Sequence, residues 1–266
     1  MGQFDPCLMY RQLFYTSEAI RSGKLEGLFK LYGIEDNDIY KIKKHIPHLH
    51  QAWDSMMIDF SSNTRRNFLK KFDYSSYRKI IDVGCNDAEL IVQLAKRFPQ
   101  FSETVIDLPD SPGLENAKQN ITANNLEDRI KAVGMDVFEE TLPGEADLVQ
   151  LFHFVNMFSP QKNQLLFHKL FESLNSGGTL LVVGPVIREY RTGFVVEEPV
   201  LYSLVFLVCK TGEGRIYSIK DIKSWMKSAG FIDIRLKTFK MLEVIITARK
   251  PALSSAPPIS KEENYD

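Results

Sequence analysis

The chain has 266 residues, of which 44% are hydrophobic and 25% are charged, and its formal net charge is −1. This balance argues against a nucleic acid or a membrane surface as the partner, because binding phosphates at useful affinity needs a clustered surplus of positive charge. The longest mostly apolar run, 199–209, is too short to span a bilayer, and the N-terminus has no basic-then-apolar leader. We therefore expect a cytoplasmic protein.

The first 72 residues show helical spacing of apolar side chains and no strand-like alternation. We expect a helical N-terminal region at 1–72 that caps the substrate side of the domain after it. Three histidines, His45, His48 and His50, lie in this region, but no carboxylate or cysteine stands at ligand spacing, so we expect no metal site. The apolar positions are Leu8, Met9, Leu13 and Phe14, and then Trp53, Met56, Met57 and Phe60.

The stretch 79–90, which reads Lys-Ile-Ile-Asp-Val-Gly-Cys-Asn-Asp-Ala-Glu-Leu, predicts a strand, a tight turn and a helix. A glycine at the end of a buried parallel strand, here Gly84, lets the backbone approach a ligand that lies across the N-terminus of the next helix. The stretch therefore indicates a nucleotide-binding α/β sheet, although it holds one glycine where such loops usually have two or three.

From Tyr77 onward, strands and helices alternate. The last two strands leave no room for a helix between them, so they must be antiparallel neighbours. The predicted fold class is α/β, a Rossmann-like seven-stranded, mostly parallel sheet with a terminal antiparallel strand. This domain spans 73–250, and a disordered tail follows at 251–266. The expected strands are 79–83, 103–107, 129–133, 146–152, 178–184, 231–237 and 241–248, and the helices lie near 88–98, 113–124, 160–174 and 219–229.

The reversed strand separates two nucleotide-binding architectures. A nicotinamide-binding domain is parallel throughout and needs glycines at positions 84, 86 and 89, but this chain has Asn86 and Glu89. The reversed strand is instead associated with methyltransferases that use S-adenosylmethionine. Gly84, Asp107 and Asp136 follow successive strands, where the Asp107 carboxylate can accept hydrogen bonds from ribose hydroxyls and Asp136 can meet an adenine amine.

Several segments carry a family resemblance. The segment Asp107-Leu108-Pro109 is similar to the Asp-Leu-Pro that ends the second strand of the small-molecule O-methyltransferases of the plant type and their bacterial polyketide-tailoring relatives. Residues 134–138, Gly-Met-Asp-Val-Phe, resemble the family's Gly-Gly-Asp-Met-Phe, and 174–182 and 214–218 match its later segments. The likeness covers roughly residues 13–249 and lacks the winged-helix dimerisation domain that usually comes first.

This resemblance implies the cofactor, the substrate class and the reaction. The substrate is a small hydrophobic or aromatic metabolite, and O-methylation is the expected reaction. A homodimer through the helical N-terminal region stays open, since the usual dimerisation domain is absent. The cofactor is S-adenosylmethionine, and the residues expected to hold it are Asp82, Gly84, Asp107, Leu108, Asp136 and Val137.

The family's catalytic groups are replaced in this chain. The family has a histidine base after its fourth strand, where this chain has Asn156, and an amide cannot act as a base near neutral pH. The basic residue four positions earlier becomes Phe152, and the glutamate at the end of the fifth strand becomes Gly184. We expect Asn156 to orient the substrate. His153 either replaces the base or packs as an ordinary histidine at a strand end.

Three functions are compatible with these replacements. The first is a methyltransferase whose acceptor is already nucleophilic, such as an amine, an acidic phenol or an enol carbon. The second is a non-methylating cyclase or pericyclase in which the bound sulfonium stabilises charge. The third is a catalytically silent ligand-binding homologue, which Asn86 and Ala88 in the first loop favour. Asp107 and Asp136 oppose the third, because a decayed site has no reason to keep both. We favour the first.

Overall fold

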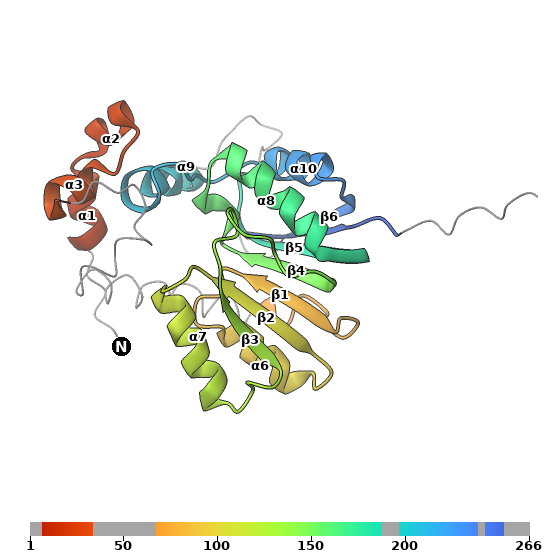
Figure 1. Ribbon diagram of the computed structural model, residues 1–266. Coiled ribbons are helices and arrows are strands. Elements are labelled where there is room, and N and C mark those ends of the chain that lie inside the picture. The colour runs from red at the N-terminus through yellow and green to blue at the C-terminus, as the bar shows by residue number, and fades with distance from the viewer. Residues whose placement is uncertain (1–6, 34–67, 188–196, 239–242, 253–266) are drawn as a thin grey trace, which may run out of the picture.

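The computed structural model describes residues 7–33, 68–187, 197–238 and 243–252, and the histidines at 45–50, the apolar positions 53–60 and the tail from 253 lie outside these ranges (Figure 1). The strands are β1 Lys79–Val83, β2 Ser102–Asp107, β3 Ile130–Gly134, β4 Ala146–Phe152, β5 Leu174–Pro185, β6 Ile232–Thr238 and β7 Glu243–Arg249. The helices are α1 Cys7–Leu13, α2 Thr16–Ser22, α3 Glu26–Tyr32, α6 Glu89–Arg97, α7 Pro112–Ala123, η2 Val155–Met157, α8 Pro160–Ser173, α9 Glu197–Val205, η3 Phe206–Lys210 and α10 Ile219–Ser228.

The seven strands form one sheet in the order β3-β2-β1-β4-β5-β7-β6. Strands β1 to β5 pair in parallel, and β7 runs antiparallel to both of its neighbours. The expected α/β fold class is confirmed, and the reversed strand is β7, inserted between β5 and β6. The strand order changes direction between β1 and β4, and ligands of such sheets bind outside the carboxyl ends of the strands at this switch point.

Strand β5 is longer than the sequence predicted. It begins at Leu174 and not at residue 178, because Leu174 pairs with Ala146 and the register then shifts before Leu148. Gly177 lies inside this irregular start with a φ of 78°. Two adjacent glycines normally indicate a loop, so the sequence pattern placed the strand after them.

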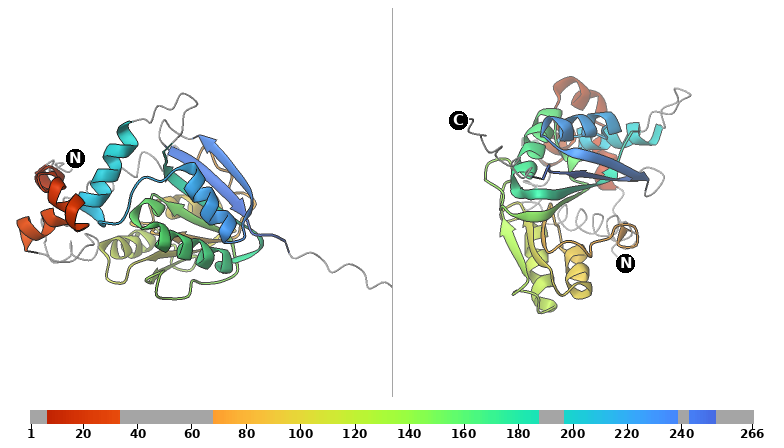
Figure 2. Two further views of the ribbon diagram at one scale, coloured as in Figure 1. Left: turned by 90° about the horizontal axis from the view of Figure 1, so that it is seen from above. Right: turned by 90° about the vertical axis from the view of Figure 1, so that its right-hand side faces the viewer.

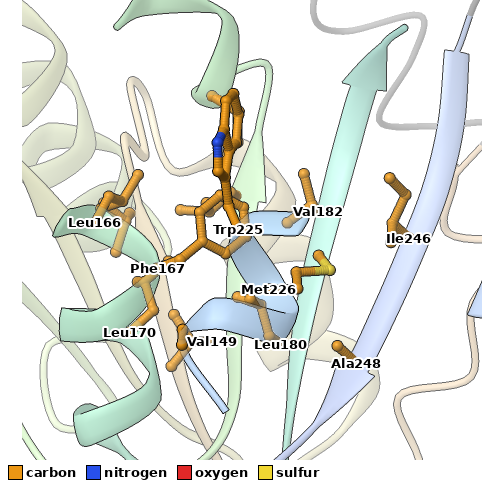
Figure 3. Packing of buried hydrophobic residues seen from close by; sticks show 14 of the residues in the cluster. Val149, Leu166, Phe167, Leu170, Leu180, Val182, Trp225, Met226, Ile246 and Ala248 are labelled. Carbon is orange, nitrogen blue, oxygen red and sulfur yellow. The ribbon is translucent and has the colours of Figure 1, made fainter. Parts of the chain in front are cut away.

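Helices cover the sheet on both faces (Figure 1). On one face, α8 and α10 pack together against strands β4, β5 and β7, where every second side chain is apolar and buried. Figure 3 shows Trp225 and Met226 of α10 with Phe167 of α8 over these strands. On the other face, α6 and α7 pack with Phe68 and Tyr74 from the segment before β1.

Polar side chains fix where these helices begin. Ser159 caps α8 and is followed by Pro160, which lacks the N–H that the first helical turn leaves unpaired. At α10, the Ser218 hydroxyl accepts from the N–H of Asp221, whose carboxylate accepts from the N–H of Ser218. These caps place the loops after β4 and before α10 at the carboxyl edge of the sheet.

The N-terminal helices α1 to α3 lie beside α9 and η3 (Figures 1 and 2). Ala19 of α2 is fully buried and packs with Val208 and Cys209 of η3, which is a π-helix. A short π-helix often marks a functional segment. Within the described ranges, no helix is both long enough and apolar enough to cross a membrane.

Candidate active site

Three residues of the loop after β1 have a left-handed backbone conformation that glycine adopts most readily. Gly84, Asn86 and Ala88 have φ values of 75°, 52° and 55°, so alternate residues are left-handed. Asparagine tolerates this conformation, whereas alanine adopts it at a cost of about 1–2 kcal/mol. Ala88 also occupies the N-cap position of α6, where its side chain makes no capping hydrogen bond. The two replacements of glycine therefore leave the loop with the conformation that glycines would give it.

The carboxylate of Asp107 joins this loop to the end of β2. Its Oδ2 accepts from the N–H of Asn86 at 3.0 Å, and its Oδ1 accepts from the N–H of Leu108 at 2.9 Å and from the Ser111 hydroxyl at 3.0 Å. A Cβ on Gly113 would lie 3.3 Å from Asp107 Oδ2, so α7 begins close against the carboxylate. The predicted ribose-binding group thus stands in a fixed orientation at the carboxyl edge.

Asp136 and Val137 follow β3 and differ in where their side chains lie. Asp136 is half-buried, and its Oδ1 accepts from the N–H of Phe138 at 3.0 Å. This bond forms a local turn, as aspartates commonly do. Val137 is 5% exposed and its side chain belongs to the core under α8. Asp136 therefore remains at the edge, whereas the carbonyl of Val137 already accepts from Nζ of Lys169 at 2.7 Å.

Three phenylalanines form an aromatic row along this edge. The ring centroids of Phe138 and Phe158 are 4.7 Å apart, and those of Phe158 and Phe154 are 4.9 Å apart. A Cβ on Gly84 would lie 2.5 Å from a ring atom of Phe154, so the row reaches from the loop after β3 to the loop after β1. The sequence analysis missed this row, because each phenylalanine alone is consistent with core packing.

Asp82 lies below the rim, inside β1. It is 5% exposed and sits between Val105 of β2 and Gln150 of β4 in the strand register. Tyr74 donates its hydroxyl to Oε1 of Gln150 at 2.7 Å on the same face. Together with Glu103 of β2, these side chains form a buried polar cluster of Tyr74, Asp82, Glu103 and Gln150. Asp82 therefore lies inside the sheet below the loop and is not exposed on the loop's surface.

Burial governs the ionisation of this cluster. It raises the pKa of Glu103 to about 8, and the nearby Arg129 opposes the shift while Asp82 adds to it. Arg129 donates to the carbonyls of Ala95 and Phe98, both at 2.8 Å, so its guanidinium group also interacts with the C-terminal end of α6. Glu103 is consequently uncharged at neutral pH.

Asn156 follows β4 and is 3% exposed. Its Nδ2 donates to the carbonyl of Arg215 at 3.1 Å and to that of Pro185 at 3.4 Å. The side chain therefore ties the end of β5 to the segment before α10. This arrangement favours a structural role for Asn156 over the expected orientation of a substrate.

His153 stands one residue beyond β4 and has a left-handed backbone with a φ of 53°. Its N–H donates to the carbonyl of Val183 at 2.8 Å, which extends the ladder between β4 and β5. Its Nε2 lies 3.3 Å from Oε1 of Glu243, the first residue of β7. The sequence analysis missed Glu243, whose position opposite Pro185 depends on the register of two distant strands.

A separate hollow of about 630 Å³ opens at the amino edge of the sheet, beside Arg78, Asp147, Thr179 and Arg249. It lies at the opposite edge from Gly84 and Asp107, and ligands of parallel sheets bind at the carboxyl ends. We assign the site to the carboxyl edge on this ground. Among the described residues, no three His, Cys, Asp or Glu side chains lie close enough together to hold a metal ion.

The strand order, the left-handed loop and the acidic residues at its rim define a Rossmann-like domain built to bind a nucleoside-containing cofactor. The chain belongs to the O-methyltransferase domain family, whose model matches residues 13–232. The resemblance drawn from the sequence motifs is thereby confirmed.

Relatives and solved structures agree with this placement. The chain is 29% identical to 3-hydroxy-5-methyl-1-naphthoate 3-O-methyltransferase of Streptomyces sahachiroi, over 70% of this chain and 52% of that protein. It is 25% identical to L-tyrosine C(3)-methyltransferase of Streptomyces lavendulae, over 86% and 61%. The structure of human N-acetylserotonin methyltransferase in complex with SAM superposes with a TM-score of 0.77 at 25% identity, covering 91% and 67%. The chain thus spans about half to three fifths of the curated relatives it matches.

Proposed function

We propose that the chain is a methyltransferase that uses S-adenosylmethionine and transfers its methyl group to a hydroxyl of a small, hydrophobic or aromatic metabolite. The observation that carries this proposal is the Asp107 carboxylate, held against the left-handed loop by the N–H of Asn86 at 3.0 Å. Carboxylates at this position in a doubly wound sheet accept hydrogen bonds from ribose hydroxyls. Family membership supports the reaction class.

The residues at the carboxyl edge fit this cofactor chemically. Asp107, next to Leu108, supplies acceptors for the ribose, and Asp136 with the N–H of Val137 supplies polar partners for the adenine. The aromatic row brings the ring of Phe154 next to Gly84, and aromatic rings can attract a positively charged group over their faces. When bound, the cofactor supplies an electrophilic methyl group on a positively charged sulfur.

The chain's own contribution is mainly to orient the reactants and exclude water. The aromatic row gives the cofactor edge an apolar wall, and apolar walls with a few polar groups are typical of sites for small aromatic ligands. The named relatives include an O-methyltransferase of a hydroxynaphthoate and a C(3)-methyltransferase of L-tyrosine. Both named substrates are aromatic, so an aromatic substrate is the best-supported class.

The helical N-terminal region, residues 1–72, is proposed to cap the substrate side of the domain at 73–250, in a cytoplasmic protein. A homodimer through this region is supported by exposed apolar side chains on α1, on α2 and in the turn between them. Tyr10, Phe14 and Ile20 are 63%, 70% and 59% exposed. Sedimentation analysis of the wild type and of Phe14→Glu tests this, and a monomer in both would refute the dimer.

Isothermal titration calorimetry with S-adenosylmethionine tests the proposed function. The wild type should bind, and Asp107→Ala should bind more weakly by about 1–3 kcal/mol, as expected when buried polar groups lose their hydrogen bonds. Asp128→Ala is the matched control, because Asp128 is exposed at the opposite edge of the sheet. No binding by the wild type at millimolar cofactor would end the proposal, and equal affinities in all three proteins would remove Asp107 from the ribose site.

A further inference from the structure

The hollow at the amino edge of the sheet has no part in the proposed function. Its volume is about 630 Å³, which lies in the range of binding sites for small molecules. Three arginines from three segments line it, namely Arg78 just before β1, Arg235 of β6 and Arg249 of β7. Three guanidinium groups in one concavity need an explanation, because like charges gathered in one place repel one another.

The floor of the hollow is made of two pairs of residues on neighbouring strands. Thr179 of β5 stands directly opposite Arg249 of β7. Thr247 of β7 stands directly opposite Arg235 of β6. Directly opposite residues of antiparallel strands point to the same face of a sheet, and so do residues two apart on one strand. The two arginines and the two threonines therefore share one face, where guanidinium and hydroxyl groups can both donate hydrogen bonds.

An irregularity in β6 brings Arg235 to this face. Ile232 of β6 pairs with Arg249 of β7, and the next pair is Arg235 with Thr247, so β6 has one more residue than β7 between the two pairs. In a regular ladder Ile234 would stand opposite Thr247. With the extra residue, Ile234 instead packs against the core on the other face, under α10. Bulges of this kind re-aim side chains and are over-represented next to functional sites.

A second irregularity, at the start of β5, forms one wall of the hollow. The register between β4 and β5 shifts between Ala146 and Leu148, and the residues of β5 that lie outside the ladder at this point, 175–178, line the hollow. Nη2 of Arg249 donates to the carbonyl of Gly177 in this segment at 3.3 Å. The wall therefore limits the orientation of the Arg249 guanidinium group at the edge of the floor.

Two carboxylates also line the hollow, but neither is paired with an arginine side chain. Oδ2 of Asp147 accepts from the backbone N–H groups of Arg78 and Lys79. Its Oδ1 accepts from Nδ2 of Asn175 at 3.1 Å. Asp233, the second carboxylate, is exposed at the bulge of β6. Among the described residues, no carboxylate forms an ion pair with any of the three guanidinium groups, so their N–H donors are not committed to an acidic side chain.

We propose that this hollow binds a small organic anion through the guanidinium groups of Arg78, Arg235 and Arg249. Arginine binds phosphate and carboxylate groups through paired N–H donors, and a concave surface with a surplus of one charge raises the local concentration of the opposite charge. Strands β4 and β5 lie between β1 and β7, so Arg78 reaches the hollow from the other side than the two arginines of the floor. A ligand with two or more phosphate or carboxylate groups fits this arrangement.

Isothermal titration calorimetry with pyrophosphate and with citrate tests the proposal, at constant ionic strength because salt screens exposed charges. The wild type should bind at least one probe, and the one bound more tightly distinguishes a phosphate from a carboxylate ligand. Arg78→Gln, Arg235→Gln and Arg249→Gln should each weaken binding by about tenfold or more, as expected for lost charge-assisted hydrogen bonds. Arg21→Gln is the matched control, because Arg21 is exposed on α2, at the other end of the molecule from β6 (Figures 1 and 2).

A charge-preserving variant separates the loss of binding from a loss of structure. Arg249→Lys keeps the positive charge but not the paired donors, so its affinity should fall between those of the wild type and Arg249→Gln. Thermal unfolding without a probe should give the same transition for all these proteins. No binding of either probe by the wild type at millimolar concentration would overturn the proposal. Affinities in the three glutamine variants equal to that of Arg21→Gln would also overturn it. None of these measurements depends on methyl transfer, so the result is independent of the proposed function.

Discussion

Replacing Glu103 by glutamine should change how the stability of the protein depends on pH. Glu103 is 2% exposed in β2, and burial raises its pKa from 4.5 to about 8. Between these two values the folded protein keeps a proton that the unfolded chain has lost. Stability must therefore fall as the pH rises through this window, because the folded state binds more protons than the unfolded state.

The magnitude follows from the size of the shift. Each unit is worth about 1.4 kcal/mol, so the full window corresponds to an upper limit of about 5 kcal/mol, and the part between pH 5 and pH 8 to roughly 4 kcal/mol. Glutamine has nearly the same shape and does not titrate. The Glu103→Gln protein should lose less stability than the wild type between pH 5 and pH 8, and should be the more stable of the two at pH 8.

Urea denaturation at pH 5, 6.5 and 8 measures this difference. Other groups titrate in the same range, but they are common to both proteins and cancel in the comparison. Glu127→Gln is the control, since Glu127 is exposed and its replacement should leave the wild-type pH dependence unchanged. Parallel pH profiles for wild type and Glu103→Gln would refute the reasoning and show that Glu103 is already ionised when buried.

Two further substitutions test the packing of the site. Gly84→Ala should destabilise the protein by about 2–4 kcal/mol, because the residue is left-handed and a Cβ would lie 2.5 Å from the ring of Phe154. A double-mutant cycle with Phe154→Ala, measured by urea denaturation, should show coupling between the two positions. Additive losses of stability would contradict the clash. Ser218→Ala should lower the stability by about 1 kcal/mol, because α10 loses its cap. Asp221 belongs to the same capping box, so the double variant with Asp221→Ala should lose less stability in thermal unfolding than the sum of the two single losses.

The sequence predicted the elements better than their lateral contacts. Strands β1 and β4 match the expected bounds, because both are mainly apolar runs, and Gly84 marks the end of β1. Ser159 with Pro160 correctly placed the start of α8. These features depend on residues close in the chain, where propensity and spacing act directly.

The features that the sequence did not predict are all contacts between residues far apart in the chain. Glu243 reaches His153 only because β7 inserts between β5 and β6, and the order of strands in a sheet is not written in local periodicity. The contact of Phe154 with Gly84 likewise depends on how the turn after β4 folds over β1. The start of β5 was not predicted, because Gly177 indicates a loop although the backbone before it pairs with β4.

The amide of Asn156 has a consequence for how this chain can evolve. It joins the carbonyls of Pro185 and Arg215, and a Cβ on Gly214 would collide with its own carbonyl oxygen. A neutral histidine offers a single N–H, so Asn156→His would release one of the two carbonyls. A histidine can therefore be accommodated at this position only together with further changes at the end of β5 or in the segment before α10.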